Sequence, residues 1–210
     1  MSVLVVVEHD RGRLASASLE ALAAARTIGG PVHAITLGAA ADALAADLAA
    51  HGADTVHQVH HDLLPDYGPE AWGEAVAQAV RTLQPTAVLA CGTDRGNEVM
   101  AQVAARLDLP MVANCNEITT GDVWNIVRVR WGGSLLEQCT LAAATKLVTV
   151  GHHVFDAAPV AAAGTVSLLA VELDASLGRT MVAERVERAA GGVVGKALDV
   201  DLDAEQVAHR

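Results

Sequence analysis

The chain has 210 residues, of which 52% are hydrophobic and only 2% are aromatic. This length allows one large domain with a sizeable core, built from aliphatic side chains and alanine rather than aromatic rings. The formal net charge is −11, with only 14 lysines and arginines, which argues against binding to nucleic acid or to an anionic membrane surface, because both need clustered cations.

Strand and helix patterns alternate through the first half of the chain. A continuous β-branched run at 3–7 is typical of a central parallel strand, and it is too short for a membrane span. The next helix has Ser16 or Ser18 as its candidate cap and ends at Gly29-Gly30. Then follow a strand at 32–37, a helix at 39–51 with Leu44 and Leu48 on one face, a strand at 55–59, and a helix from Pro69 to Pro85.

A buried strand at 87–91 leads into a tight polar turn and another helix. Gly92-Thr93-Asp94 ends the apolar run, and either Thr93 or Asp94 can cap the helix. Asp108-Leu109-Pro110 ends this helix, because the residue before proline avoids helical angles. Its predicted buried stripe consists of Val99, Val103 and Leu107.

After Pro110 the pattern changes to strands with no long helix between them. The predicted strands lie at 112–115, 124–131, 135–140 and 146–150, with 165–173 as a further candidate. Gly132-Gly133 predicts a hairpin turn. We therefore expect one three-layer α/β/α, Rossmann-like domain over residues 1–188, with a mostly parallel sheet and an added antiparallel portion. Residues 189–210 are rich in Gly, Asp and Ala, which predicts a linker or tail.

The turn at 91–96 lies where a parallel sheet normally binds ligands, at the carboxyl ends of its strands. Free N–H groups at the start of the next helix can bind an anion, so one hypothesis places a nucleotide phosphate near Thr93 to Asn97. The segment has neither GxGxxG nor GKS/T, however, and Asp94 would repel a phosphate. A structural turn is the favoured interpretation.

Histidines suggest a metal site, which the spacing does not support. His57, His60 and His61 lie close together beside Asp62, and His152-His153 forms a second pair. In a strand, His57 and His61 would share one face while His60 points away. No HExxH spacing occurs, so a solvated strand end and loop is the favoured interpretation, and no metal ligand is assigned.

The sequence offers no catalytic nucleophile. Ser134 lies in a Gly-Gly-Ser turn rather than a GxSxG elbow. Cys91, Cys115 and Cys139 are widely spaced, form no CxxC, and have no electropositive neighbours. They indicate a reducing compartment, and no catalytic residue is assigned.

Two arginines and a tryptophan stand out in this acidic chain. Alternation places Arg128 and Arg130 on one face of a strand, and Val127, Val129 and Trp131 on the other. One interpretation is a half-exposed strand with Trp131 in the core. The other is an interface strand, because arginine and tryptophan are favoured at the centres of protein contacts.

Several segments, in this order, resemble the N-terminal domain of the electron transfer flavoprotein alpha subunit. They are VLVVVEHDRGRL, SLEALAAARTIGGPVHAITLG, DYGPEAWGEAVAQAV, TDRGNEVMAQVAARLDLPMVANC and VRVRWGGSLLE. The resemblance implies an adenine nucleotide alpha hydrolase-like fold. It also implies a non-enzymatic electron carrier that pairs with a beta subunit, takes electrons from flavin dehydrogenases and passes them to a quinone reductase or another acceptor.

In that family FAD is held by a C-terminal domain that opens with a segment such as GGRG, and this chain contains no such segment. We therefore expect FAD in the full complex, no cofactor-binding residue in this chain, and no membrane insertion. The expected location is the cytoplasm of a prokaryote, or the mitochondrial matrix if a presequence has been removed. The alternatives are a stand-alone adenine-nucleotide-binding module and a non-catalytic interaction subunit of a split flavoprotein.

Overall fold

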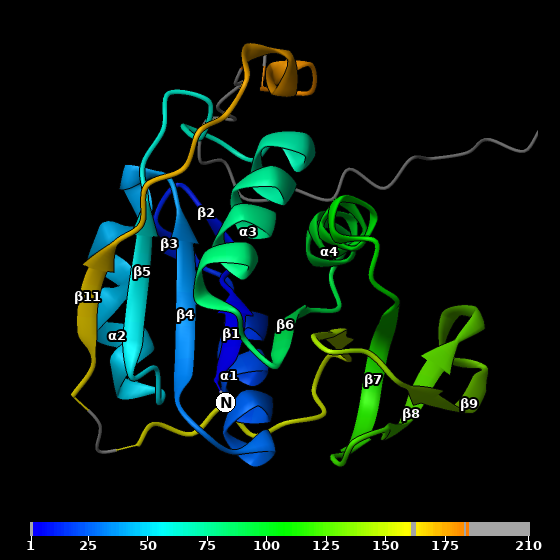
Figure 1. Cartoon of the computed structure of the whole chain (residues 1–210). Helices are drawn as coiled ribbons and strands as arrows, with labels where there is room; N and C mark the ends of the chain where they lie inside the picture. Colours follow the sequence, from blue (N-terminus) through cyan, green and yellow to red (C-terminus); the bar gives the residue numbers. More distant parts are fainter. Residues whose placement is uncertain (1, 161–162, 183, 185–210) are drawn as a thin grey trace, which may run out of the picture.

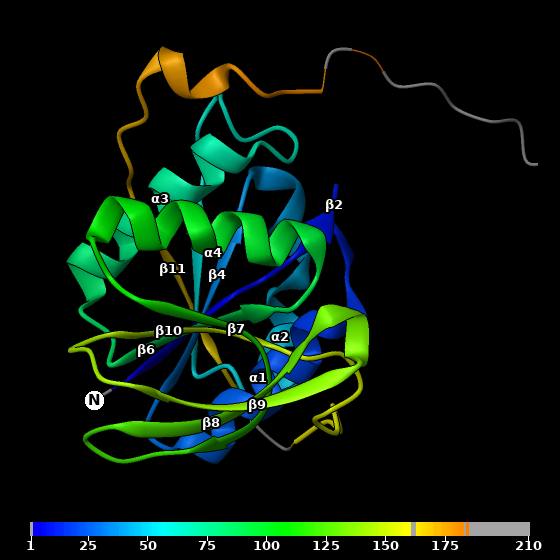
Figure 2. The same ribbon diagram turned by 90° about the vertical axis from the view of Figure 1, so that its right-hand side faces the viewer.

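A computed structural model describes residues 2–160, 163–182 and 184 of the chain. A nine-stranded sheet, mostly parallel, lies between two layers of helices, with α3 and α4 on one face and α1 and α2 on the other (Figures 1 and 2). The strand order is β11-β5-β4-β1-β6-β10-β7-β8-β9. The predicted three-layer, Rossmann-like architecture is thus confirmed.

The elements follow the predicted order closely. The sheet strands are β1 Val3–Val6, β4 Val32–Leu37, β5 Thr55–Val59, β6 Ala87–Cys91, β7 Met111–Thr119, β8 Trp124–Arg130, β9 Leu135–Leu141, β10 Lys146–Val150 and β11 Thr165–Leu168. A separate small ribbon pairs β2 His9–Asp10 with β3 Arg13–Leu14. The α-helices are α1 Ser16–Ile28, α2 Ala45–Ala50, α3 Pro69–Leu83 and α4 Asp94–Leu107.

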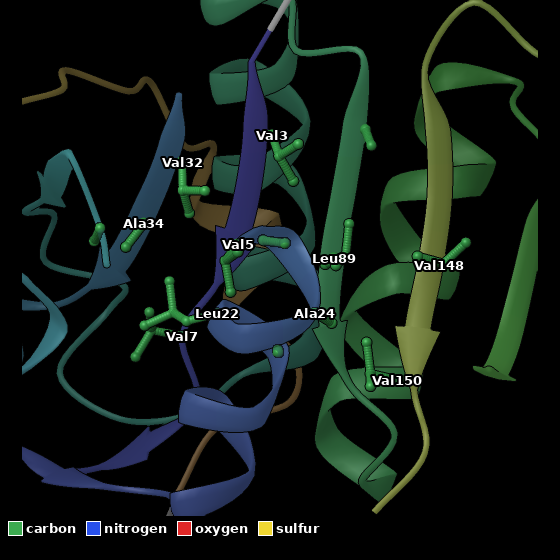
Figure 3. Close-up of a cluster of buried hydrophobic side chains, with 14 of the residues drawn as sticks. Val3, Val5, Val7, Leu22, Ala24, Val32, Ala34, Leu89, Val148 and Val150 are labelled. Atoms are coloured by element: carbon green, nitrogen blue, oxygen red, sulfur yellow. The ribbon is translucent and has the colours of Figure 1, made fainter. Parts of the chain in front are cut away.

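Two aliphatic cores lie on opposite faces of the sheet. Every residue of β1 and β6 is buried, because both strands are covered on both sides. Alternation sends Val3 and Val5 into the core beneath α1, and Leu4 into the core beneath α3. Figure 3 shows the first core, where Leu22 and Ala24 of α1 meet valines of several strands.

The antiparallel portion lies at one edge of the sheet, although in the chain it comes between two parallel strands, β6 and β10. β10 pairs in parallel with both β6 and β7, although it follows β9 in the chain. β7, β8 and β9 then pair antiparallel and form the edge of the sheet. The predicted antiparallel portion is confirmed, and its edge position results from β10 returning to fill the space between β6 and β7.

The predictions for the region 39–51 and for the cap of α1 were wrong. The region 39–51 is not one α-helix: a 3-10 helix at Ala39–Leu44 precedes the short α2, although Leu44 and Leu48 are buried as expected. Neither Ser16 nor Ser18 caps α1, whose cap is Ala15 without a side-chain bond. The Ser18 hydroxyl instead accepts from the Glu8 N–H at 2.8 Å and donates to the Glu8 carbonyl at 3.1 Å, because this buried side chain must satisfy its own polar atoms.

A strap formed by β11, an extended segment and a 3-10 helix at Ala175–Gly178 runs back over α3 (Figure 1). β11 pairs with β5 and ends at Leu168 rather than at 173, and the chain beyond it packs Leu169 and Val171 against the α3 core. The Gln78 side chain holds it by donating to the Glu172 carbonyl at 2.7 Å and accepting from the Glu172 N–H at 3.0 Å. The predicted linker or tail at 189–210 lies outside the described residues.

A buried histidine of β5, His57, pairs with a half-buried histidine of β4, His33. His57 is only 6% exposed, so its assignment to a solvated strand end was wrong. Its Nε2 lies 2.8 Å from Nδ1 of His33, and the two ring planes are nearly parallel, at 3°. The Nδ1 atom of His57 is buried without a partner. The pair can share one proton, but a second would place two charged rings in contact.

This pair should make the fold sensitive to acid. Burial lowers the pKa of both rings, with the charge of His33 adding to the effect at His57 and Asp54 opposing it at His33. Since the unfolded chain then binds more protons, the contribution to stability is complete above about pH 6.5 and declines as the pH falls below that value. Urea unfolding from pH 7.5 to 5.5 should show this decline, and His57→Gln should reduce it. An unchanged slope in His57→Gln would contradict the assignment.

Candidate functional site

At the switch point of the sheet, the carboxyl ends of β1 and β6 are joined by hydrogen bonds between the chain's own side chains. Thr93 caps α4 by accepting the Gly96 N–H at 2.9 Å, and its hydroxyl donates to Oε2 of Glu8. The Cys91 thiol also donates to that carboxylate oxygen, at 3.3 Å. The Thr93 cap confirms one of the two predicted alternatives, while the part played by Glu8 had no signal in the sequence.

This arrangement does not suit an anion. Glu8 places a carboxylate where a phosphate would lie, and Asp94 adds a second acid at the start of α4. The side chain of Asn97 is committed elsewhere: its Oδ1 accepts from Thr149 Oγ1 at 2.6 Å, and its Nδ2 donates to Asn114 Oδ1 at 3.3 Å. The geometry therefore disfavours the nucleotide hypothesis for Thr93 to Asn97.

Among the residues that the structure describes, the cysteines and the remaining histidines form no reactive site. Burial, with a further effect of Glu8, raises the pKa of Cys91 to about 12, so the thiol stays protonated near neutral pH. His60 pairs with Asp42 at 2.8 Å, and Nδ1 of His61 accepts the Leu63 N–H at 3.1 Å. In the part of the chain that the structure describes, no three His, Cys, Asp or Glu side chains are grouped so that they could hold a metal ion.

The β8–β9 hairpin (residues 124–141) carries the most exposed large apolar side chain of the described residues. Trp131 is 81% exposed, so the interpretation that placed it in the core was wrong. Leu135 and Leu136, just after the turn, are also exposed. Arg128 pairs with Glu137 at 2.8 Å, and Arg130 lies 3.8 Å from the same carboxylate. The hairpin therefore presents apolar and cationic groups together.

The tip of this hairpin has a left-handed backbone. Gly132-Gly133 forms the turn, as predicted, with φ of 60° and 97°. Trp131 has φ of 54°, a conformation that costs a bulky residue about 1–2 kcal/mol. A hollow of about 300 Å³ opens beside it and is lined in part by Asn114, Arg128 and Arg130. A tryptophan that is both strained and exposed indicates a function other than stability.

Replacing Trp131 by glycine should stabilise the fold. Glycine adopts left-handed angles without steric cost, so we expect Trp131→Gly to raise the free energy of unfolding by about 1 kcal/mol. Trp131→Ala, which keeps the strain, should change it by less than about 0.5 kcal/mol. Urea unfolding of both variants tests this, and a destabilised Trp131→Gly would show that the indole makes stabilising contacts.

One face of this antiparallel extension carries no helix. Figure 1 shows β8 and β9 reaching past α4, at the edge of the sheet opposite β11. On that face Asn125, Gln138 and Thr140 are exposed. No helix among the described residues has the length and apolar character to cross a bilayer.

Comparison with known proteins identifies the family of this chain. The family described as "Electron transfer flavoprotein domain" matches residues 3–176. The chain belongs to the electron transfer flavoprotein domain family. It is 30% identical over 158 residues to the "Electron transfer flavoprotein subunit alpha" of Pseudomonas aeruginosa, covering 75% of this chain and 50% of that protein. It is 28% identical over 166 residues to the "Probable electron transfer flavoprotein subunit alpha, mitochondrial" of Caenorhabditis elegans, covering 79% and 49%.

A further relative, the "Electron transfer flavoprotein subunit alpha" of Mycobacterium tuberculosis, is 30% identical over 164 residues, covering 77% of this chain and 51% of the relative. The chain spans about half the length of these relatives and corresponds to the N-terminal domain of an electron transfer flavoprotein alpha subunit. Membership of the electron transfer flavoprotein family confirms the predicted resemblance.

Proposed function

We propose that this domain is a scaffold part of a two-subunit, FAD-containing electron carrier. It would dock a beta subunit while other parts of the complex hold the flavin and exchange electrons with flavin dehydrogenases and a quinone reductase or another acceptor. The family match over residues 3–176 is the main observation that supports this proposal. The relatives with bacterial and mitochondrial names support a location in the cytoplasm or the mitochondrial matrix.

The residues of this domain do not fit FAD at the place where the fold normally binds a ligand. The crevice between β1 and β6 holds the Glu8 carboxylate, bonded to Thr93 and Cys91, so the pyrophosphate of FAD would meet a fixed negative charge. We therefore assign no flavin contact to this crevice, and no step of electron transfer is derived through it. The domain's proposed contribution is to position its partners.

Co-expression tests the proposal directly. The 210-residue chain should co-purify with the electron transfer flavoprotein beta subunit of the same organism. Purified alone, the chain should lack flavin absorbance near 450 nm, and FAD titration should give no spectral change. Failure to bind the beta subunit in the presence of FAD would overturn the scaffold role. Stoichiometric FAD on the chain alone would overturn the placement of the flavin.

A further inference from the structure

We infer that Trp131 is the anchor by which the β8–β9 hairpin engages the beta subunit, and that the matching surface is an apolar socket bordered by a carboxylate. This inference rests on the proposed function and specifies one contact within it. The observations that support it are the exposure of the Trp131 indole, the free donors of the Arg130 guanidinium and the positive charge of the hairpin.

The indole of Trp131 is largely uncovered by its own chain. Trp131 is 81% exposed and held at a left-handed φ of 54°. Within the described residues, its ring forms no hydrogen bond, ring stack or cation–π contact, whereas Trp72 and Trp124 are both buried. Tryptophan buries a large area with few rotatable bonds, and for this reason it is enriched among residues that dominate interface energies.

The hairpin carries a net positive charge, although the chain as a whole is acidic. Arg128, Arg130 and Glu137 are the charged residues of the hairpin, giving it a formal charge of +1 in a chain of −11. Arg128 is bound by Glu137 at 2.8 Å, but Arg130 is 46% exposed and only 3.8 Å from that carboxylate, which is too long for a hydrogen bond. The Arg130 guanidinium therefore retains donors that a carboxylate of the partner can accept.

The pairing of β8 with β9 determines which apolar side chain lies beside Arg130. The exposed Leu135 lies directly opposite Arg130 in the β8–β9 pairing, and Leu136 lies opposite Val129. Cross-strand partners share a face, so Leu135 lies beside Arg130, whereas Leu136 and Val129 lie on the opposite face. A socket that accepts the indole and covers Leu135 would bring an acidic rim to Arg130.

The test is calorimetric titration of the beta subunit, in the presence of FAD, into the wild-type chain and three variants. Trp131→Ala should weaken binding about 30-fold or more, the size expected for a dominant interface residue. Arg130→Glu should weaken binding more at low than at high salt, because it opposes the partner's carboxylate. Leu168→Ala is the matched control: Leu168 is 70% exposed but lies on β11, at the opposite edge of the sheet.

The binding results distinguish a failure of the Trp131 anchor from a failure of the proposed function. Wild-type affinity in Trp131→Ala, or a larger loss in Leu168→Ala, would overturn the anchor while leaving the proposed function intact. An absence of binding by the wild-type chain would overturn the proposed function and this contact with it. If the wild-type chain dimerises in sedimentation runs and Trp131→Ala is monomeric, the hairpin contacts a second copy and the assignment to the beta subunit is wrong. Circular dichroism should show that all variants fold.

Discussion

Replacing Trp72 by alanine is expected to destabilise the domain by about 3–5 kcal/mol, the usual cost of removing a large buried aromatic side chain. Trp72 is 2% exposed in the first turns of α3. Its Nε1 donates to the Asp66 carbonyl at 3.0 Å, and its ring lies 5.3 Å from those of His9 and Tyr67. The substitution would leave a cavity beneath α3 and remove the hydrogen bond to the Asp66 carbonyl.

The chain supplies its own control for this experiment. Trp131→Ala removes the same side chain from a position that is 81% exposed, so its effect on the free energy of unfolding should be below about 0.5 kcal/mol. Urea unfolding followed by circular dichroism compares the two variants directly. Equal losses in the free energy of unfolding would mean that Trp72 and Trp131 do not differ in burial as described.

The second large effect is expected at the turn between β6 and α4. Gly96 is buried in the first turn of α4, and a Cβ atom there would overlap the Cys91 carbonyl oxygen, which belongs to rigid backbone. Glycine to alanine normally stabilises a helix by up to about 1 kcal/mol. Here the sign should reverse, with Gly96→Ala costing about 1–3 kcal/mol as α4 is pushed from the sheet.

A suitable comparison for Gly96→Ala is Gly29→Ala at the end of α1. A Cβ atom at Gly29 meets nothing within 4 Å, so only its left-handed φ of 89° opposes the substitution. Thermal unfolding should rank Gly96→Ala as the more damaging change. A stabilised Gly96→Ala would show that α4 does not approach β6 as closely as described.

The parallel half of the fold could be predicted because local sequence determines it. The apolar run of β6, the Thr93 cap and the stripe that contains Val99 and Val103 all act within a few residues, and all three were confirmed. The position of β10 could not be predicted, because it depends on pairing with β6 and β7, which precede it by many residues. Nothing in the composition of Lys146–Val150 specifies its neighbours.

The candidate surface was only partly predictable. The sequence identified Arg128, Arg130 and Trp131 as an interface candidate, but left open whether Trp131 was in the core, because alternation gives the faces of a strand and not what covers them. The exposure of Trp131 follows from the turn at Gly132-Gly133, where strand alternation stops. The burial of His57 was missed for a similar reason, since its partner His33 is on another strand.

The position of β10 has a consequence for how the chain is assembled. β7 is synthesised before β10, so a growing chain can pair β7 with β8, and β8 with β9, while the space beside β6 is still empty. Both edges of that gap remain unpaired until Val150 has been made, and such edges favour pairing with other chains. The β7–β9 meander is therefore expected to form first by local contacts, with closure of the sheet as the slow, long-range step.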